Sequence, residues 1–230
     1  MTQLMTVSVD VVVFGYSPES AKLRVLLIRR GTDPFKGDWA LPGGRVELDE
    51  SIDAAARREL EEETGIKPDF LEQLYTFGEP GRDPRGRVVS VAYYALVSVE
   101  QFTPVAGTDA AVAAWLPITD GNGTPLSNLA FDHREILETA LARLRGKIRY
   151  FPLGIEMLPK LFTMTELRQV YETVLGRDLD PGNFRRRILR MDLLVPTGKR
   201  RATTTKPAAL YKFDVAKYRN LSKKGWLFEV

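Results

Sequence analysis

Residues 44–66 read GRVELDESIDAAARRELEEETGI, a charged stretch in which small and apolar residues recur at roughly helical spacing. Gly65 is a favourable stop for a helix because glycine readily adopts the backbone conformation that ends one. The stretch therefore predicts a helix from residue 50 to residue 64, entered through a glycine-containing loop.

Three carboxylates fall on one face of this predicted helix. Glu59, Glu62 and Glu63 lie at positions i, i+3 and i+4, so their side chains face a common point. Like charges this close repel one another, and a hard cation held by oxygen ligands relieves that repulsion. The spacing favours Mg²⁺ or Mn²⁺; the alternative is a solvated acidic face that meets no metal.

The sequence on either side predicts a sheet. Runs of β-branched and large apolar residues alternate with Gly- and Pro-containing loops, which is typical of strands. A second amphipathic helix is expected to begin at an Asp132 cap and to end at Gly146. The predicted strands cover residues 5–15, 22–30, 70–79, 88–99 and 111–118.

After residue 146 the pattern changes to short helices. Thr163 with Glu166 forms a capping box, and Asp180 followed by Pro181 forms the start of a second helix that extends to about Met191. The extended pieces LLVPTG and ALYKF then flank the loop KRRATTTKP. Helix, turn, helix and hairpin predict a winged helix-turn-helix, and we expect two domains, residues 1–146 and 147–230.

Composition excludes several classes of protein. There are no cysteines, so disulfide frameworks, zinc fingers and cysteine nucleophiles are excluded. No apolar run approaches the ~20 residues of a membrane span, and the N-terminus lacks the features of a secretory signal. We therefore expect a cytoplasmic protein that does not enter the membrane.

The charges are segregated along the chain. Residues 1–145 hold 15 Lys and Arg against 22 Asp and Glu, and residues 146–230 hold 18 against 8. The net charge of the first part is therefore −7 and that of the second part is +10. So large a positive excess favours a polyanionic partner such as nucleic acid, because phosphate neutralisation releases counterions. The alternative is a basic surface that serves only solubility.

The stretch at residues 44–66 resembles the Nudix signature at every fixed position. The resemblance implies an α+β fold, a Nudix α/β/α sandwich with a mixed sheet, and attack of a metal-activated water on a pyrophosphate linkage. It implies that Glu59, Glu62 and Glu63 are metal ligands, one of them also the base, and that Glu50 and Arg58 support the site.

The flanking segments PFKGDWALPGG and YTFGEPGRDPRGRVVSVAYYALV resemble Nudix proteins that act on or sense ADP-ribose. Arginines in the second segment suit bidentate pairing with a diphosphate, and an ordinary solvated turn is the alternative. Trp39 is expected to stack on adenine or to belong to the core. His133 is interpreted as a polar residue at a helix start, with a ligand contact as the alternative. The predicted ligand contacts are Arg30, Trp39, Gly43, Gly44, Arg82, Asp83, Arg85 and Arg87.

The segment DPGNFRRRILRMD carries four arginines on one short predicted helix. In a helix-turn-helix the second helix enters the DNA major groove, and a wing reaches phosphates or the minor groove. The predicted DNA contacts are Asn183, Arg185, Arg186, Arg187 and Arg190 on the helix, and Lys199, Arg200, Arg201, Thr203 and Lys206 on the wing.

Nearly the whole chain resembles the Nudix-related transcriptional regulators of NAD metabolism, which fuse a Nudix domain to a winged helix. The resemblance rests on residues 162–198 and on KPAALYKF at residues 206–213. It implies a homodimeric repressor that binds a palindromic double-stranded DNA operator and responds to ADP-ribose or a related nucleotide. Many such regulators have a degraded Nudix box, whereas this box is complete, so hydrolysis of the effector stays open.

A different class of function competes with this hypothesis. The chain resembles ADP-ribose pyrophosphatases as well, in which case the basic segment serves dimerisation or contact with RNA. The complete set of glutamates favours this alternative, and the arginine-rich helix opposes it. A third class, removal of damaged nucleoside triphosphates, gives the C-terminal domain no use.

Overall fold

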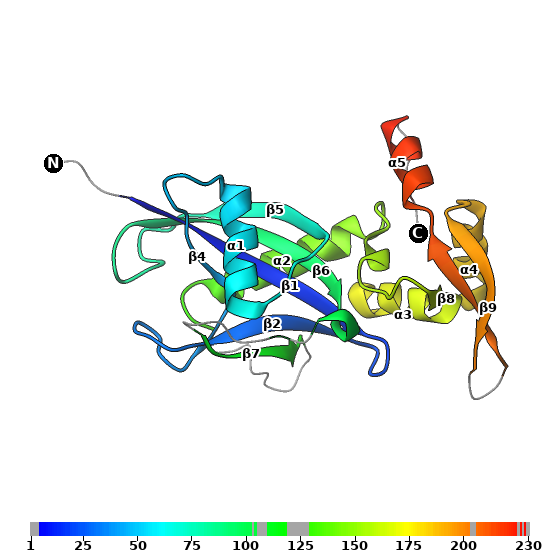
Figure 1. Cartoon of the computed structure of the whole chain (residues 1–230), viewed down its shortest axis with the longest axis horizontal. Helices are drawn as coiled ribbons and strands as arrows, with labels where there is room; N and C mark the ends of the chain where they lie inside the picture. Colours follow the sequence, from blue (N-terminus) through cyan, green and yellow to red (C-terminus); the bar gives the residue numbers. More distant parts are fainter. Residues whose placement is uncertain are drawn as a thin grey trace.

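The computed structural model describes residues 5–102, 104, 110–118, 129–202, 206–224, 226 and 228. A large sheet flanked by helices occupies one end of the long axis, and a group of shorter helices with a small sheet occupies the other (Figure 1). The chain passes from the first part to the second through one long helix.

Seven strands form the larger sheet. The central strand β1 (Thr6–Ser17) runs parallel to β6 (Val88–Ser98) and antiparallel to β2 (Lys22–Arg30), so the sheet is mixed, as predicted. The order along the sheet is β3-β2-β1-β6-β5, with β4 paired to β1 and β7 paired to β2. The remaining strands are β3 (Trp39–Ala40), β4 (Gly43–Arg45), β5 (Phe70–Phe77) and β7 (Ala110–Pro117).

Helices cover both faces of this sheet. Successive side chains of a strand point to opposite faces, so Val11 and Val13 pack in the core beneath α1 (Ile52–Thr64), whereas Val12 and Phe14 pack in the core on the side of α2 (His133–Lys147). Burial on both sides explains why β1 is an unbroken apolar run rather than an alternating one. The layered arrangement agrees with the predicted α/β/α sandwich.

Helix α1 ends where its sequence predicts and begins two residues later than predicted, at Ile52. The Ser51 side chain accepts a hydrogen bond of 3.2 Å from the Ala54 N–H, and the chain leaves the helix at Gly65. Ala55, Ala56 and Leu60 are buried against the sheet. The opposite face of the helix is left for charged residues.

Helix α2 departs from its prediction at both ends. Asp132 occupies the N-cap position, but its side chain makes no cap hydrogen bond, because Arg82 holds the carboxylate instead. The helix does not end at Gly146: it continues through Lys147 to a C-cap at Ile148. The expected boundary between residues 146 and 147 falls inside this last turn, and it stays a prediction.

The second part is a winged helix-turn-helix. Helix α3 (Met164–Leu175) begins with the predicted capping box of Thr163 and Glu166, and α4 (Pro181–Arg190) begins at an Asp180 cap. Strands β8 (Phe162–Thr163), β10 (Ala208–Phe213) and β9 (Leu194–Arg201) form a three-stranded antiparallel sheet in that order.

The predicted wing loop needs a correction. Lys199, Arg200 and Arg201 continue strand β9 rather than opening a loop, because residues 200 and 201 pair with Ala209 and Ala208. Thr203 lies outside the described residues. A further helix, α5 (Val215–Lys223), follows the wing and was not predicted from the sequence. Two short 3-10 helices, η1 (Val99–Gln101) and η3 (Leu153–Ile155), complete the described elements.

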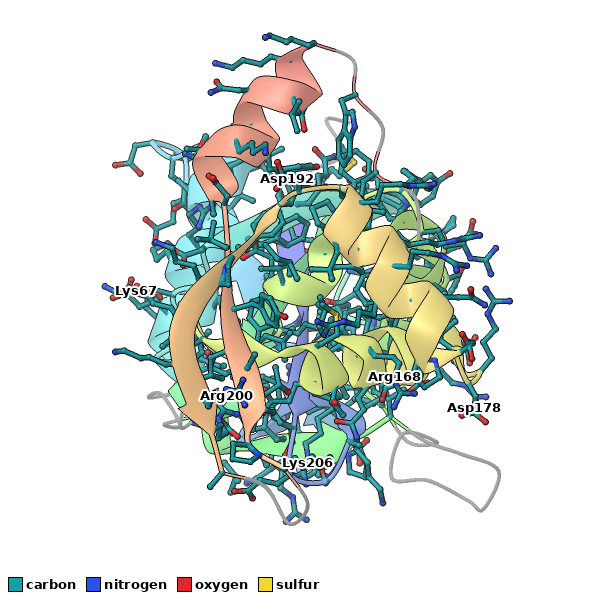
Figure 2. The ribbon with its side chains drawn as sticks, turned by 90° about the vertical axis from the view of Figure 1, so that its right-hand side faces the viewer. Lys67, Arg168, Asp178, Asp192, Arg200 and Lys206 are labelled. Carbon is teal, nitrogen blue, oxygen red and sulfur yellow. The ribbon has the colours of Figure 1, made fainter. Side chains whose placement is uncertain are left out.

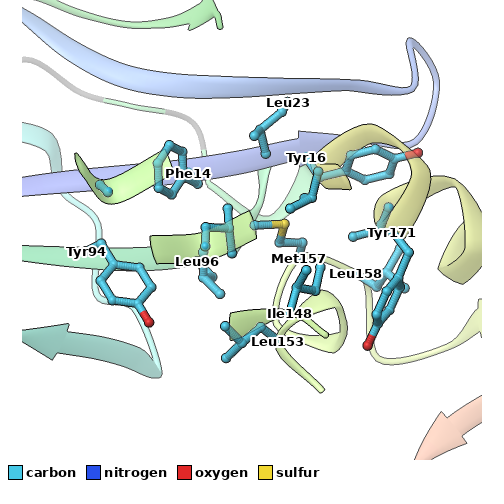
Figure 3. Close-up of a cluster of buried hydrophobic side chains, with 14 of the residues drawn as sticks. Phe14, Tyr16, Leu23, Tyr94, Leu96, Ile148, Leu153, Met157, Leu158 and Tyr171 are labelled. Atoms are coloured by element: carbon cyan, nitrogen blue, oxygen red, sulfur yellow. The ribbon is translucent and has the colours of Figure 1, made fainter. Parts of the chain in front are cut away.

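One hydrophobic core runs through both parts of the molecule. Tyr16 from the large sheet, Ile148 from the end of α2, and Tyr171 from α3 belong to the same buried cluster (Figure 3). The fit is close at η3, where a side-chain carbon on Gly154 would overlap the Tyr171 ring. The winged helix is therefore packed against the rest of the chain rather than tethered to it.

Candidate functional site

Two of the three glutamates of α1, Glu59 and Glu62, contact an arginine from the same helix. The Arg58 guanidinium donates to Glu59 at 2.9 Å and to Glu62 at 3.1 Å. It also grips Glu50 through bonds of 2.6 and 3.0 Å, as expected if Glu50 and Arg58 support the site. Arg58 thereby offsets the mutual repulsion of these carboxylates.

Glycines let the loop before α1 lie against two of these carboxylates. The Gly43 N–H donates to Glu63 Oε2 at 2.8 Å, and Gly43 has a φ of 157°, at which an added side chain would collide with the Val9 carbonyl. A side chain at Gly44 would overlap the Glu59 carboxylate. Gly43 is thus required where β4 lies against β1, whereas a side chain at Gly44 would force the Glu59 carboxylate to move.

The electrostatics of the cluster differ between its members. Burial raises the pKa of Glu59, although the Arg58 hydrogen bond and charge oppose that shift. The side-chain hydrogen bond to Glu50 raises the pKa of Arg58 above its usual value. Glu62 is 60% exposed at its side chain, compared with 14% for Glu59. A cation that approached Glu59 would therefore meet a carboxylate that burial has left poorly solvated.

The donor set suits a hard divalent cation. Glu59 and Glu63 both line the cavity described below, and their oxygen ligands match the preference of such ions. Among the residues that the structure describes, no three acidic or histidine side chains gather closely enough to hold an ion. Arg58 donates to carboxylate oxygens of Glu59 and Glu62 that a metal ion would need as ligands. Binding of an ion by these two residues would therefore require the Arg58 side chain to move.

A cavity of about 510 Å³ opens beside the glutamates, a size typical of ligand-binding pockets. Its wall is acidic at Glu59 and Glu63 and rich in arginine elsewhere, so it offers one side for a cation and another for anionic groups. The charged residues of the lining are Asp10, Arg30, Arg45, Glu59, Glu63, Arg82, Asp83, Arg85 and Arg87, and Phe131 and His133 also contribute.

A buried ionic cluster forms part of this wall. Arg82 reaches Asp132 with bonds of 2.8 and 2.6 Å and Asp10 at 3.0 Å, and the Ser90 hydroxyl also donates to Asp10. Burial by itself raises the pKa of Asp10, but His133 and Arg82 outweigh it and bring the pKa below its ordinary value. The Arg82 side chain is 4% exposed, so its guanidinium is committed to two carboxylates.

His133 completes the cluster. Its Nδ1 accepts a hydrogen bond of 2.9 Å from the Leu41 N–H, so the ring proton lies on Nε2, which faces Asp10 Oδ1 at 3.2 Å. The interpretation of His133 as a polar residue at a helix start missed this burial. The sequence offered one signal for this cluster. Asp10 is a single carboxylate among the apolar residues of β1, and a charged group in a buried strand requires polar partners.

The other predicted ligand residues are placed as follows. Arg85 pairs with Asp83 at 2.7 Å, Arg87 donates to the Gly78 carbonyl at 2.5 Å, and Arg30 donates to the Pro34 carbonyl at 2.8 Å. These residues line the cavity. Trp39 does not appear in the lining: its partly buried ring packs against the hydrophobic core, the alternative that the sequence left open.

The predicted DNA contacts gather at the far end of the molecule. Figure 2 views this end, where α4 and strand β9 face the viewer and the labelled Arg200 and Lys206 lie at the wing. Phe184 and Ile188 bury one face of α4, which leaves the other face exposed. The exposed residues include Asn183, Arg185, Arg186, Arg187 and Arg190 on the helix and Lys199, Arg200, Arg201 and Lys206 on the wing.

Three of these arginines already have protein partners. Arg186 donates to the Asn183 side chain one turn earlier, Arg201 pairs with Glu166, and Arg185 donates to the Tyr211 hydroxyl at 3.4 Å. The first two contacts lie at the exposed surface, where ion pairs and hydrogen bonds contribute little to stability. The other exposed cations of the helix are held on a rigid scaffold and project from it.

Comparison with known families divides the chain in the same way as its fold. Residues 5–140 match the model of the NUDIX domain, and residues 154–213 match that of the NrtR DNA-binding winged helix domain. In the described part of the chain, no helix has the length and apolar character that crossing a membrane requires.

Individual relatives resemble the chain over most of its length. The ADPR responsive transcriptional repressor NtrR of Acinetobacter baylyi is 38% identical over 94% of this chain and 84% of its own. A crystal structure of Shewanella oneidensis NrtR in complex with a 27mer DNA is 37% identical, with a TM-score of 0.78 over 90% of this chain and 93% of that one. The NUDIX domain of the same protein in complex with ADP ribose is 36% identical, with a TM-score of 0.54 over 62% of this chain and 90% of that one.

Proposed function

The chain belongs to the Nudix family and, within it, to the NrtR-type proteins that carry a DNA-binding winged helix, and from this we propose that it is a transcriptional repressor of NAD or ADP-ribose-linked metabolism. It binds double-stranded operator DNA through α4 and the wing, and it senses ADP-ribose or a related nucleotide in the cavity beside α1. The observation that carries the proposal is the presence of both sites on one continuous core.

The DNA end has the chemistry that an operator requires. Arg185, Arg186, Arg187 and Arg190 project from a helix whose opposite face is anchored by Phe184 and Ile188. Arginine suits both guanine edges and phosphates, and a helix held in this way enters a major groove without rearrangement. Lys199 and Arg200 extend the cationic surface along the wing.

The ligand end suits a nucleoside diphosphate compound. We propose that Mg²⁺ or Mn²⁺ is the cation, held by Glu59 and Glu63 with Glu62 joining once Arg58 moves. A cation held there would offset the negative charge of the ligand's phosphates. Gly43 and Gly44 keep the backbone close to the phosphates, and Asp83 orients Arg85 toward the cavity through bonds of 2.7 to 3.2 Å.

We propose that α2 couples the two ends. Its first residue, His133, belongs to the ionic cluster in the cavity wall, and its last turn contributes Leu144 to the core shared with α3. Arg145 donates to the Val174 carbonyl at 3.2 Å, and Thr173 of α3 donates to the Ala21 carbonyl at 3.2 Å. A ligand that binds one arrangement of these contacts more tightly shifts the population toward it.

A palindromic operator requires two copies of the winged helix. We propose that the protein acts as a homodimer whose recognition helices are separated by about one turn of DNA, roughly 34 Å. Because α2 connects the cavity wall to α3, ligand binding acts on this separation through the contacts between the winged helix and its own Nudix domain. A small change in the separation is sufficient to weaken operator binding.

Hydrolysis of the effector is a second candidate activity, favoured by the complete set of Glu59, Glu62 and Glu63. One of these carboxylates would act as the base toward water, and the raised pKa of Glu59 suits that role better than a fully solvated glutamate does. Release of AMP and ribose 5-phosphate from ADP-ribose in the presence of Mg²⁺ or Mn²⁺ tests this activity, with the Glu63→Gln variant as the control.

The experiment that tests the proposed function is selection of bound DNA from a random pool, followed by gel shifts with and without ADP-ribose. We expect a reproducible palindrome whose binding weakens as ADP-ribose is added. Failure to enrich any sequence would contradict the assignment as a regulator, and an unchanged gel shift at saturating ADP-ribose would contradict its role as a sensor.

A further inference from the structure

Helix α5, which follows the wing, carries positive charges and no acidic side chain. It begins at an Asp214 cap, whose carboxylate accepts a hydrogen bond of 2.9 Å from the Lys217 N–H, and none of its residues is buried. The match to the DNA-binding winged helix domain ends at residue 213, the last residue of β10. Helix α5 therefore lies beyond the domain to which the family match assigns DNA binding.

The two faces of α5 differ in chemistry. Tyr218 and Leu221, at positions i and i+3, are partly buried against the hydrophobic core, and the Tyr218 ring centroid lies 5.8 Å from that of Phe213. Arg219 and Lys223, at positions i and i+4, are exposed on the other side of the helix. One face thus anchors α5 on the winged helix, and the other presents two cations to the surroundings.

The protein does not neutralise the cations of this outer face. In the part of the chain that the structure describes, neither Arg219 nor Lys223 forms an ion pair. Glu156 is close enough to interact electrostatically with Arg219, but no hydrogen bond joins the two side chains. Cations stabilise the C-terminal end of a helix, which accounts for Lys223 and Lys224 there but not for Arg219 in the middle of α5.

The first turn of α5 is held beside the end of the recognition helix. Lys217 pairs with Asp192, which lies two residues after Arg190 at the end of α4. Figure 2 shows Asp192 between the end of α4 and the start of α5, whereas Arg200 and Lys206 of the wing lie at the opposite side of the same view. The cations of the wing, of α4 and of α5 therefore follow one another across this end of the molecule.

The chemistry of the outer face suits a polyanion better than a protein partner. The cores of protein interfaces are depleted of charged residues and enriched in aromatic ones. On α5 the one large apolar residue that is exposed is Val215. The outer face is also continuous with the cationic surface of α4, and the sugar–phosphate backbone of DNA borders the major groove that a recognition helix enters. A row of phosphates is therefore the partner that this position and this charge favour.

We propose that Arg219 and Lys223 of α5 contact the phosphate backbone beside the groove that α4 enters, on the side opposite to the wing. The inference rests on the proposed function and enlarges its DNA-binding surface. Phosphate contacts carry no base information, so α5 raises the affinity for operator and for unrelated DNA by the same factor and leaves the choice of sequence to α4. This contribution falls as salt rises, because phosphate neutralisation releases counterions.

The test is the salt dependence of DNA binding by the full chain, measured by fluorescence anisotropy with the selected operator and with a duplex of unrelated sequence. The double variant Arg219→Gln/Lys223→Gln should lower the slope of log affinity against log salt by about 1.8 on both duplexes, since each phosphate contact contributes about 0.9. The matched control Lys67→Gln/Arg134→Gln removes two charges from exposed side chains of the Nudix domain and should leave the slope unchanged.

Two further measurements locate the contact. Hydroxyl-radical footprinting of the operator should show that the double variant loses protection of the backbone beside each half-site and retains it within the half-site. The variant Arg219→Lys/Lys223→Arg keeps both charges, so it should retain the wild-type slope. Circular dichroism of each variant shows that a change in slope does not come from unfolding.

An unchanged slope in the Arg219→Gln/Lys223→Gln variant, or an equal decrease in the control, would overturn the inference. A weaker dimer in this variant without DNA, measured by sedimentation at an unchanged slope, would also overturn it, because α5 would then bind a second copy of the chain. Wild-type protein that binds neither duplex would contradict the proposed regulator together with the α5 contact. Wild-type binding with an unchanged slope in the double variant would contradict the α5 contact alone.

Discussion

The imidazole Nδ1 of His133 accepts a hydrogen bond of 2.9 Å from the backbone N–H of Leu41. This bond joins the first residue of α2 to the segment that leads into Gly43, whose own N–H is bound by Glu63. The carboxylate face of α1 and the helix that reaches the winged helix are thus connected through three consecutive residues, 41 to 43. We therefore expect replacement of His133 to affect both α1 and α2.

We expect His133→Ala to lower the free energy of unfolding by about 2 kcal/mol, because the buried Leu41 N–H and Asp10 each lose a partner. Urea unfolding followed by tryptophan fluorescence measures the change. Arg134→Ala is the matched control, since this neighbour is exposed and makes only an i,i+4 pair with Glu138. Equal stability of His133→Ala and Arg134→Ala would show that the buried bond contributes nothing.

The ionic cluster predicts a specific pH dependence. The pKa of Asp10 is depressed in the folded state, so its stabilising contribution is complete above its ordinary value of 3.8 and is lost as the pH falls below it. We expect Asp10→Asn to cost about 3 kcal/mol at pH 7, because Arg82 is left partly unpaired. The difference from wild type should shrink as the pH falls through 4 in urea unfolding.

The control for this prediction is Asp49→Asn, an exposed residue in the loop before α1. It should leave the free energy of unfolding unchanged at every pH. A constant difference between Asp10→Asn and wild type from pH 7 to pH 3 would contradict the assignment of the depressed pKa to Asp10.

The carboxylates of α1 should make nucleotide binding depend on metal. We expect Mg²⁺ to raise the affinity of the wild-type protein for ADP-ribose. Glu59→Gln and Glu63→Gln should each reduce this increase by a factor of about ten. Calorimetric titration with Mg²⁺ and with EDTA measures it. Glu61→Gln is the control, because Glu61 is exposed on the same helix and pairs with Lys67. A Mg²⁺ effect of equal size in all three variants would place the metal elsewhere.

Two arginines of α2 allow the coupling through this helix to be tested. Arg145 donates to Val174 of α3, whereas Arg143 donates to Leu74 of the large sheet at 3.1 Å. We expect Arg145→Ala to reduce the effect of ADP-ribose on operator affinity about five-fold, since one hydrogen bond is worth about 1 kcal/mol. Arg143→Ala should leave that effect unchanged. If ADP-ribose changed the operator affinity of both variants by the same factor, the proposed coupling through α2 would be contradicted.

We expect arginines of helix α4 to contact phosphates of the operator DNA. We expect Arg186→Ala and Arg187→Ala each to lower the slope of log affinity against log salt by about 0.9 if each neutralises one phosphate. Fluorescence anisotropy of labelled operator between low and moderate salt measures the slope. Arg57→Ala on α1 is the control, since this arginine lies in the Nudix domain. Unchanged slopes in both α4 variants would move the DNA contacts to other residues.

Local signals in the sequence predicted the elements that short-range chemistry determines. The spacing of Glu59, Glu62 and Glu63, the capping box at Thr163 and the Pro181 start of α4 all depend on residues within one or two turns. The support of the site by Glu50 and Arg58 was implied by the resemblance to the Nudix signature, and the structure pairs the two side chains.

Long-range pairings were not accessible in the same way. Arg82 lies in a Gly- and Pro-rich loop that resembles a ligand-contacting turn, and its partners Asp10 and Asp132 are 72 and 50 residues away. The contacts of Phe131 carry no sequence signal, because they depend on its positive φ and on Arg30 and Arg85 from other segments. Trp39 beside the Nudix box had two interpretations, and only packing distinguishes them.

The central claim is that one nucleotide site and one DNA site on this chain are thermodynamically coupled. Coupling of this kind is reciprocal, so the factor by which ADP-ribose weakens operator binding must equal the factor by which operator weakens ADP-ribose binding. Calorimetric titration of ADP-ribose into free and into operator-bound protein, with Mg²⁺ present, measures the second factor. We predict a lower ADP-ribose affinity for the operator-bound protein, by the factor found in the gel shifts; equal affinity for both forms would contradict the claim.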